Sequence, residues 1–424
     1  MSSEYDMPEG ILGISLAFEG IKDAATIMNG PTGCKSYPAW LSEHAYPCRD
    51  KECYTNVPFK YYRRFFFTQP RVPCTYMDSD DYIMGTREKL DEVFEDVTAL
   101  KPNLIGLINS PGASLIGETL TLKAEKGVVV RIESPQPSIP LGIGFQDTMI
   151  KILETLSPKK QKKRKGVNLV GITIWDLGWE DTIDDLKDIL NSCGIKVNTV
   201  IGAGCTVSEL RSSGNAELNV IVHRDMGEKI AKWYERELYV PFVESKLGAP
   251  IGFDALEDWI LQICGKLNVN PSKAMKRIRE KRERVATVLL SLYTVHKPTV
   301  GHTFSVVAQG SVAYPVMSFL YDYLGLLPVA VNTGTDRSFD DEIKKFVKEN
   351  ELDVSDDVSE TPAVVMIGDG VSVASAEYRG LVRGGFDTAR RGRTIVCIEE
   401  RPLLGLGGTM RLLDGVMNIV RRMD

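Results

Sequence analysis

Short apolar runs alternate with amphipathic helical patterns through most of this chain, and that alternation restricts the possible folds more than any other feature. Residues 167–174 read Val-Asn-Leu-Val-Gly-Ile-Thr-Ile, the pattern of a buried strand. Residues 181–190 follow with apolar side chains at helical spacing, and 195–200 form the next apolar run. Strands that alternate with helices imply a parallel sheet covered on both faces. We therefore predict an α/β fold.

The same alternation recurs on both sides of this region. Further strands are predicted at 104–108, 127–132, 217–222, 303–307, 327–332, 363–367 and 394–398, and further helices at 226–237, 272–286 and 312–324. A chain of 424 residues is too long for one ordinary core, and a prior of about 150 residues per domain suggests three. Pro158 and Gly166 flank six basic residues, which indicate an exposed linker. We predict three Rossmann-like domains with mainly parallel sheets around a central cleft, at 1–157, 167–295 and 296–424, with the basic linker at 158–166.

Composition excludes several classes of protein. Hydrophobic residues make up 43% of the chain and charged residues 25%, which are the proportions of a globular protein. The net charge of −6 argues against nucleic acid as a partner, since nucleic-acid binders are normally basic. The first residues lack a signal-peptide pattern, and no apolar run approaches the ~20 residues that a membrane span needs. We therefore expect a cytoplasmic protein with no membrane contact, whose thiols are reduced.

Four of the eight cysteines fall within the first 74 residues. They are Cys34, Cys48, Cys53 and Cys74, and their segments are rich in glycine, proline and aromatic residues. Thiolates gathered in such a segment suit an iron–sulfur cluster, which needs four ligands, normally cysteine sulfurs. We predict that these four cysteines bind a cluster, with Cys34, Cys48 and Cys53 as the leading metal ligands. The other cysteines, at 193, 205, 264 and 397, have no ligand-like spacing and indicate structural thiols.

Each of the four cysteines also has another interpretation. Cys34 follows Gly33, which permits close approach and positive backbone angles, but a buried structural thiol fits the same position. The C-x4-C spacing from Cys48 to Cys53 does not identify a ligand pair by itself. The metal alternative is a four-coordinate zinc site of nitrogen and sulfur ligands, His44, Cys48, Cys53 and Cys74. It ranks below the cluster because this spacing matches no common zinc module.

Two further side chains are candidates for the substrate cleft. Lys35 follows the first cysteine, where its charge suits a reduced cluster or an anionic substrate, and a solvated loop lysine is the alternative. His223 follows a predicted strand, although lone histidines at such positions are more often structural. Residues 368–370 and 405–408 are rich in glycine, but neither segment completes a dinucleotide-binding fingerprint, so the sequence gives only weak support for phosphate binding.

Several segments, taken in order along the chain, carry a family resemblance. Residues 29–34 read Asn-Gly-Pro-Thr-Gly-Cys, similar to a His-Gly-Pro-x-Gly-Cys loop with asparagine in place of histidine. Residues 78–90 resemble an acidic lead into a Phe-Gly-Gly turn and helix. The remaining matches are a strand with an Ile-Gly-Asp segment at 101–110 and 115–118, and second-domain segments at 167–171, 185–190 and 215–219. Together they resemble nitrogenase component 1, the superfamily of nitrogenase α and β subunits, their cofactor-assembly scaffold, and protochlorophyllide-type and other nitrogenase-like reductases.

The chain departs from the family pattern at three places. The family usually has a cysteine between the strand and the Ile-Gly segment, where residues 110–114 read Ser-Pro-Gly-Ala-Ser. The cysteine that caps the iron–molybdenum cofactor has no match, and His223 falls only roughly in its region. The cofactor's C-terminal histidine motif has no counterpart around residues 399–402. The resemblance therefore implies a nitrogenase-like oxidoreductase that does not reduce dinitrogen.

The function that the resemblance implies is a catalytic-component subunit of a nitrogenase-like reductase. An ATP-dependent iron–sulfur reductase would supply low-potential electrons, and a cluster of the 4Fe-4S type, which family members commonly share between subunits, would relay them to a substrate in the interdomain cleft. ATP would bind only to the partner reductase. A paralogous subunit or a second copy of the chain would complete a heterotetramer or homodimer. The alternatives are a non-catalytic scaffold for cofactor assembly and a structural subunit without its own cluster, and the substrate stays open.

Overall fold

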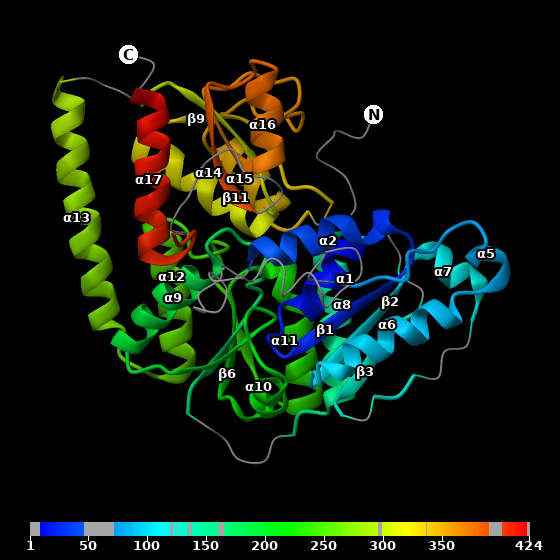
Figure 1. Ribbon diagram of the computed structural model, residues 1–424. Coiled ribbons are helices and arrows are strands. Elements are labelled where there is room, and N and C mark those ends of the chain that lie inside the picture. Colours follow the sequence, from blue (N-terminus) through cyan, green and yellow to red (C-terminus); the bar gives the residue numbers. More distant parts are fainter. Residues whose placement is uncertain are drawn as a thin grey trace, which may run out of the picture. The chain divides into compact units, whose positions relative to one another are not determined.

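The structure is a computed structural model that describes residues 9–45, 72–118, 122–124, 126–133, 135, 138–159, 165–295, 299–335, 337–389 and 401–421. These residues form two compact units (Figure 1). The N-terminal unit comprises Pro8–Lys162 and Ile201–Asn215, and the C-terminal unit comprises Lys163–Val200 and Ala216–Asp424. The described residues contain three sheets, one of three strands and two of four.

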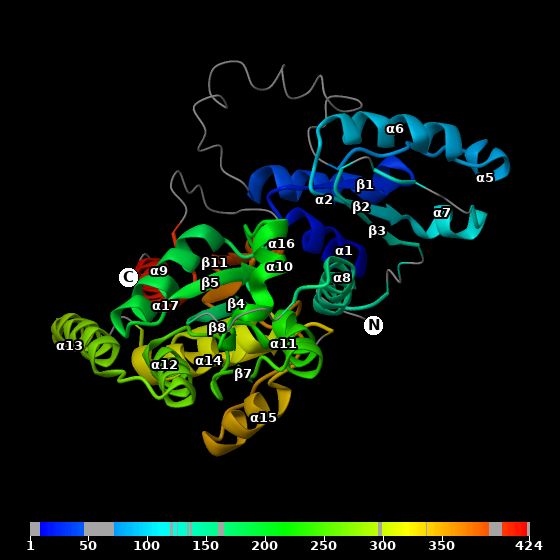
Figure 2. The ribbon, with the colours of Figure 1, turned by 90° about the horizontal axis from the view of Figure 1, so that it is seen from below.

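The sheet of the N-terminal unit has the order β1-β2-β3, and its strands are parallel. They are β1 (Ala24–Asn29), β2 (Leu104–Asn109) and β3 (Val128–Ile132). Helices α1 (Gly10–Glu19) and α8 (Leu141–Leu156) pack against each other on one face of this sheet, and α6 (Arg87–Ala99) covers the other (Figure 2). The other helices among the described residues of this unit are α2 (Thr32–Ala45), α5 (Asp81–Met84), α7 (Pro111–Ile116), α10 (Val207–Ser212) and the 3-10 turn η2 (Ser213–Asn215).

Helical spacing explains how α6 covers its face of the sheet. Leu90, Val93, Phe94 and Val97 recur three and four residues apart, and all four are buried. They pack against side chains of β1 and β2 in one apolar cluster. Full burial of such a side chain stabilises a fold by about 1.5–3 kcal/mol. This cluster holds the two strands whose carboxyl ends carry the candidate site.

The first sheet of the C-terminal unit has the order β5-β4-β6-β7. Its strands are β4 (Val167–Val170), β5 (Val197–Ile201), β6 (Leu218–Ile221) and β7 (Phe242–Val243). The accompanying helices are α9 (Trp179–Ser192), α11 (Arg224–Leu238), α12 (Phe253–Leu267) and α13 (Ser272–Val295). After β4 the chain moves to β5 on one side and then returns to β6 on the other. The strand order therefore reverses between β4 and β6, the place where open α/β sheets bind ligands.

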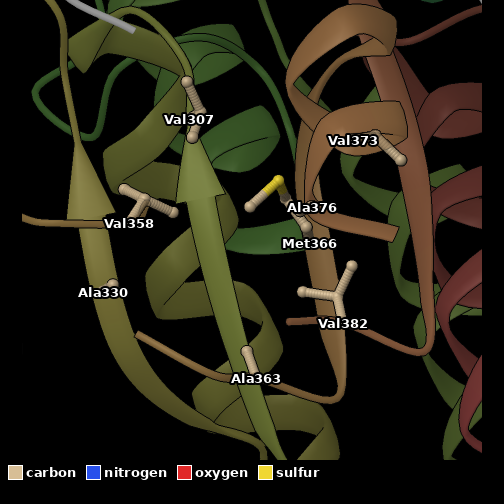
Figure 3. Packing of buried hydrophobic residues seen from close by; sticks show 8 residues of the cluster. All are labelled: Val307, Ala330, Val358, Ala363, Met366, Val373, Ala376 and Val382. Carbon is tan, nitrogen blue, oxygen red and sulfur yellow. The ribbon is translucent and has the colours of Figure 1, made fainter. Parts of the chain in front are cut away.

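The second sheet of the C-terminal unit has the order β11-β10-β8-β9, with parallel pairing throughout. Its strands are β8 (Thr303–Val307), β9 (Leu327–Asn332), β10 (Val365–Asp369) and β11 (Gly384–Ala389). Its helices are α14 (Gly310–Leu324), α15 (Asp340–Glu349), α16 (Gly370–Tyr378) and α17 (Gly405–Arg421). Figure 3 shows side chains of β8, β9, β10 and α16 meeting on one face of this sheet, with Met366 near the centre. Small partners such as Ala330 and Ala376 let this layer pack closely.

The predicted alternation of strands and helices is confirmed in every described region. The strand predicted at 167–174 is too long, because β4 ends at Val170. Gly171 has a φ of 97°, and a Cβ there would lie 2.4 Å from the carbonyl oxygen of His223, so the backbone must turn at a glycine. The strand predicted at 394–398 and most of the basic linker lie outside the described residues. The domain boundaries and the central cleft stay predictions. Among the described helices, none is long and apolar enough to cross a membrane.

Candidate functional site

A buried polar network joins the ends of β1 and β2. Asn29 donates from Nδ2 to Oδ1 of Asn109 at 3.0 Å, and the Thr75 hydroxyl donates to Oδ1 of Asn29 at 2.9 Å. The backbone N–H of Ser110 donates to the Asn29 carbonyl at 2.7 Å. Because buried amides are costly to leave unpaired, this network fixes the loops that follow both strands. Those loops carry the first cysteine and the segment where the family cysteine is missing.

Cys74 lies in an extended segment that runs along the free edge of β1. The N–H of Met28 donates to the Pro73 carbonyl at 2.9 Å, and the N–H of Thr75 donates to the Met28 carbonyl at 3.2 Å. These bonds form a parallel bridge between Met28 and Cys74, whose side chain is fully buried. Backbone pairing therefore determines where this thiol lies.

Cys34 lies in the first turn of α2, and its thiol is half-buried. Gly33, which permits a positive backbone angle, does not use one, because α2 begins at Thr32 and Gly33 is already helical. Placing Cys34 near a helix N-terminus has a chemical consequence, since the helix dipole favours negative charge there. The helix N-terminus favours a thiolate at this position, whereas burial opposes it by raising the pKa of Cys34.

Lys35 is fully buried beside the two cysteines. Its Nζ donates to the Tyr76 hydroxyl at 3.3 Å and lies 5.2 Å from the centre of the Tyr76 ring. Tyr76 has a φ of 50°, an uncommon angle for a tyrosine, and this turn follows Cys74 directly. A buried lysine is rare unless anions or acceptors surround it. We call Cys34, Cys74, Lys35 and Tyr76 the thiol site.

The electrostatics of the thiol site show that its groups affect one another. Burial raises the pKa of Cys34. Burial also raises the pKa of Cys74, which the Tyr76 backbone and the Lys35 charge lower and the Cys34 charge raises. Burial and the charge of Cys74 raise the pKa of Tyr76 to about 12. Without a cation the sulfurs therefore keep their protons at neutral pH, and a bound metal would displace them.

The donor chemistry of the thiol site fits an iron–sulfur cluster in part. Two cysteine sulfurs with a buried cation nearby are the groups that an anionic, thiolate-bound cluster requires. Cys48 and Cys53 lie outside the described residues, and so does the side chain of His44. Among the described residues, no three His, Cys, Asp or Glu side chains are grouped so that they could hold a metal ion. The predicted ligand set and the zinc alternative therefore stay predictions.

Ser110 occupies the segment where the family usually has a cysteine, and its hydroxyl has a structural role. Its Oγ accepts from the N–H of Ala113 at 3.1 Å and so caps α7. A Cβ on Gly30 would lie 2.5 Å from the Ser110 Cβ, so the loops after β1 and β2 touch at this point. The Ser114 hydroxyl likewise donates to the carbonyls of Ser110 and Glu133. These hydroxyls hold loops together in place of a sulfur ligand.

His223 lies in the C-terminal unit, two residues after β6 and directly before α11. Its side chain is only 1% exposed, and neither ring nitrogen has a hydrogen-bond partner within the part of the chain that the structure describes. Its Nε2 lies 3.9 Å from Oδ1 of Asp176. The other oxygen of Asp176 accepts from the N–H of Thr173 at 2.8 Å. The structure thus places a buried histidine and a fixed carboxylate together where the strand order reverses.

The two glycine-rich segments are occupied by carboxylates. Asp369, inside the first segment, accepts from the N–H groups of Val371 and Ser372 and caps α16. Asp185 of α9 accepts from the N–H of Gly407 at 3.0 Å at the start of α17. Burial raises the pKa of Asp185, although the backbone N–H groups of Gly407 and Leu406 lower it. Carboxylates of the chain itself therefore take the positions that phosphate would need.

Comparison with known proteins identifies the family of this chain. The family model described as nitrogenase component 1 type oxidoreductase matches residues 10–421. The chain belongs to this family. The B subunit of light-independent protochlorophyllide reductase from Synechococcus sp. is 27% identical over 188 residues, which cover 41% of this chain and 34% of the relative. Its counterpart from Roseobacter denitrificans is 29% identical over 183 residues, covering 40% and 35%. The chain thus spans about a third of the length of these curated relatives.

A solved structure identifies the fold across the whole chain. The structure described as "Nitrogenase Cp1 at pH 6.5" superposes with a TM-score of 0.74 at 15% sequence identity, covering 99% of this chain and 93% of its own. The α/β fold with parallel sheets is therefore that of nitrogenase component 1, and the predicted family is confirmed. At a sequence identity this low, the similarity establishes the fold and no shared function.

Two residues of these sites were missed by sequence analysis. Tyr76 receives the Lys35 ammonium, and Asp176 faces His223. A signal for Asp176 was present. Asp176 follows β4 and His223 follows the neighbouring strand β6, and the carboxyl ends of parallel strands share one edge of a sheet. No local signal was available for Tyr76, since its position depends on the pairing of Cys74 with Met28 in β1, a distant part of the sequence.

Proposed function

We propose that this chain is the catalytic-component subunit of a nitrogenase-like reductase, in which an iron–sulfur cluster receives low-potential electrons from an ATP-dependent partner. One observation carries the proposal: at the carboxyl edge of the first sheet, Cys34 and the buried Lys35 lie near enough to Cys74 for their charges to act on its pKa. Family membership supports the reaction class. A cytoplasmic location stays part of this proposal.

Cys34 and Cys74 would hold the cluster, and Cys48 and Cys53 would supply further sulfurs. One-electron transfer is the chemistry that such a cluster supplies. The chain's own residues tune that chemistry. The α2 N-terminus and the Lys35 charge stabilise added negative charge, and burial of Cys74 keeps water away. Since Ser110 is committed to capping α7, any missing ligand must come from outside this loop, from a paralogous subunit or a second copy.

The partner reductase would dock on an exposed apolar surface next to this edge. We call it the α5–α7 patch: Tyr82, Ile83, Met84 and Leu115, which are 47%, 83%, 84% and 88% exposed. Helices α5 and α7 touch, and α7 starts at the Ser110 cap that contacts the loop leading to Cys34. Apolar side chains this exposed mark interaction sites. A partner docked here would lie close to the thiol site.

Met84→Asp tests the docking surface. We expect it to weaken association with the reductase at least tenfold, while the iron content is unchanged. Tyr378→Asp, which alters an exposed side chain of the C-terminal unit, is the matched control. Equal affinity of both variants for the reductase would contradict docking at the α5–α7 patch.

The substrate proposal starts from the relatives, which are named protochlorophyllide reductases. An unsaturated tetrapyrrole such as protochlorophyllide is the first candidate, and carbon–sulfur bonds and small unsaturated molecules are the others. His223 is the proposed substrate contact. Lys35, the other predicted cleft residue, lies in the thiol site, so we assign its charge to the cluster.

The deciding experiment measures iron and acid-labile sulfide, with EPR of the reduced protein, after strictly anaerobic purification. Cys34→Ala is compared with Cys205→Ala, which removes a buried thiol of the same unit that lies in a backbone bridge with Ile21. Iron and sulfide in equal amounts, lost only in Cys34→Ala, would support the proposal. Zinc, or no metal in any subunit combination, would refute it and leave a structural subunit.

A second measurement separates the reductase from a scaffold. The chain, its reductase and ATP are incubated with protochlorophyllide, and product is followed by absorbance. ATP-dependent turnover supports catalysis. Release of bound metal to an acceptor protein, without turnover, supports a scaffold for cofactor assembly.

A further inference from the structure

His223 is the most unusual polar side chain of the C-terminal unit. Its imidazole is 1% exposed, and both ring nitrogens lack hydrogen-bond partners among the described residues. Native proteins rarely leave such groups unsatisfied, and an exception calls for a functional explanation. A ligand that bonds to the ring would supply one.

The surroundings of His223 favour a ligand site over a purely structural role. It follows β6, and residues 171–176 follow β4, so both lie at the carboxyl edge of the sheet where the strand order reverses, the place where open α/β sheets bind ligands. Gly171 lies so close to the His223 backbone that a side chain there would collide with it. His223 is also the residue before α11, a helix of 15 residues whose N-terminus has no side-chain cap from it.

Asp176 faces one nitrogen of the imidazole. Its Oδ1 lies 3.9 Å from Nε2, and its Oδ2 is held by the N–H of Thr173 at 2.8 Å. Residue 176 also bridges to Ala389 at the end of β11, which steadies the loop. At 3.9 Å the carboxylate faces Nε2 without a hydrogen bond, and Nδ1 is left for a reactant. A carboxylate that closes onto the ring in the substrate complex would position a histidine acid or base, since catalytic hydrogen bonds often tighten only there.

We infer that His223 donates a proton from Nδ1 to the reduced substrate and that Asp176 positions it. This inference rests on the proposed function, which supplies the electrons. Reduction of a carbon–carbon double bond adds two electrons and two protons. In the step assigned to His223, its N–H bond breaks, a C–H bond forms at the carbon that carries the electron pair, and the imidazolium becomes neutral imidazole. Water restores that proton and supplies the second one.

The test uses the full chain with its reductase, ATP and protochlorophyllide as the probe. His223→Gln keeps the hydrogen-bonding shape but cannot transfer a proton, and His302→Gln is the matched control in the same unit. We expect His223→Gln to lower kcat about 10²–10⁴-fold and to abolish the slowing of the wild-type rate in D2O. The EPR signal of the reduced cluster should be unchanged. Asp176→Asn should lower kcat about tenfold with KM unchanged.

The outcomes separate the two proposals. If the wild-type complex shows neither a cluster signal nor turnover, the proposed function fails and the proton-donor role fails with it. If the wild type turns over and His223→Gln is as active as His302→Gln, only the proton-donor role is refuted, and an internal water satisfies the ring. If circular dichroism shows that His223→Gln does not fold, the Asp176→Asn variant provides the test instead. A kcat equal to that of the wild type in Asp176→Asn would overturn the inference.

Discussion

Gly30→Ala should destabilise the N-terminal unit through one identifiable collision. The added Cβ would lie 2.5 Å from the Ser110 Cβ and 2.6 Å from its Oγ, about 1 Å closer than carbon atoms normally approach. Overpacking of this kind costs about 1–3 kcal/mol, and the lower entropy of the unfolded chain returns about 0.4–1 kcal/mol. We expect a net loss of about 1–2 kcal/mol. For a unit of this size, that lowers Tm by about 2–8 °C.

Gly33→Ala is the matched control, because it lies in the same segment and a Cβ there meets nothing within 4 Å. It adds a better helix former to α2, so Tm should stay the same or rise slightly. Thermal unfolding is followed by circular dichroism, and iron content is measured in parallel, since Gly30 precedes the Cys34 turn.

Ser110→Gly provides the decisive double variant. By itself it loses a helix cap, and glycine in that place costs only a few tenths of a kcal/mol. Combined with Gly30→Ala it removes both colliding atoms, so the double variant should be about 1 kcal/mol more stable than additivity predicts. A Tm of Gly30→Ala within 1 °C (about the precision of a melt) of wild type, or strict additivity of the two changes, would refute the steric argument.

Three further changes test other contacts. Asp225→Ala should destabilise the C-terminal unit by about 2–4 kcal/mol in urea unfolding, because it leaves the Ser311 N–H and hydroxyl without their acceptor, whereas the exposed Asp184→Ala should change little. Asn29→Ala should cost about 2 kcal/mol by thermal melting, since it removes the buried amide that bonds both neighbouring loops; an unchanged Tm would contradict this. Burial raises the pKa of Asp185 above 3.8, so the unfolded chain ionises first and stability falls as pH rises through the folded pKa. The urea midpoint of Asp185→Asn, relative to wild type, should therefore increase as pH rises above about 4, and a constant difference would count against it.

The sequence predicted most elements of the fold because their signals are local. The helix predicted at 226–237 is α11 (Arg224–Leu238), and the strand at 303–307 is β8 (Thr303–Val307). Errors occurred where a distant contact decides the backbone. The strand predicted at 167–174 stops early at Gly171, whose positive φ and close approach to the His223 backbone depend on a distant segment of the chain. The helix predicted at 272–286 continues to Val295. The prediction stopped short because the last turns of this helix bury little and show no strong apolar periodicity.

The candidate site was harder to predict than the fold. Cysteine clustering selected Cys34 and Cys74 as candidates, but only the pairing of residues 73–75 with β1 shows that Cys74 lies at the edge of the sheet next to which α2 carries Cys34. Burial of Lys35 was not visible in a polar segment of the sequence. The His223–Asp176 pair required the strand order, because adjacency of β4 and β6 cannot be read from either strand alone.

The helix N-termini of the last sheet suggest where nucleotide is not bound. Rossmann-like folds receive phosphate at the N-terminus of a helix that follows a strand. Here Asp225 accepts from the first turn of α14, Asp369 caps α16, and Asp185 accepts at the start of α17. The first of these turns is also closed sterically, because a Cβ on Gly310 would lie 1.5 Å from the Ser338 carbonyl oxygen.

These three carboxylates change what the last sheet can do. Each neutralises a helix dipole that would otherwise attract an anion, and each would repel an incoming phosphate. The glycines that resemble parts of a nucleotide fingerprint are therefore explained by close packing: Gly405 and Gly407 make room for the Asp185 carboxylate. These contacts account for both glycine-rich segments without a bound phosphate, and among the proposed ligand contacts of the C-terminal unit they leave His223, at the carboxyl edge where β4 and β6 are neighbours.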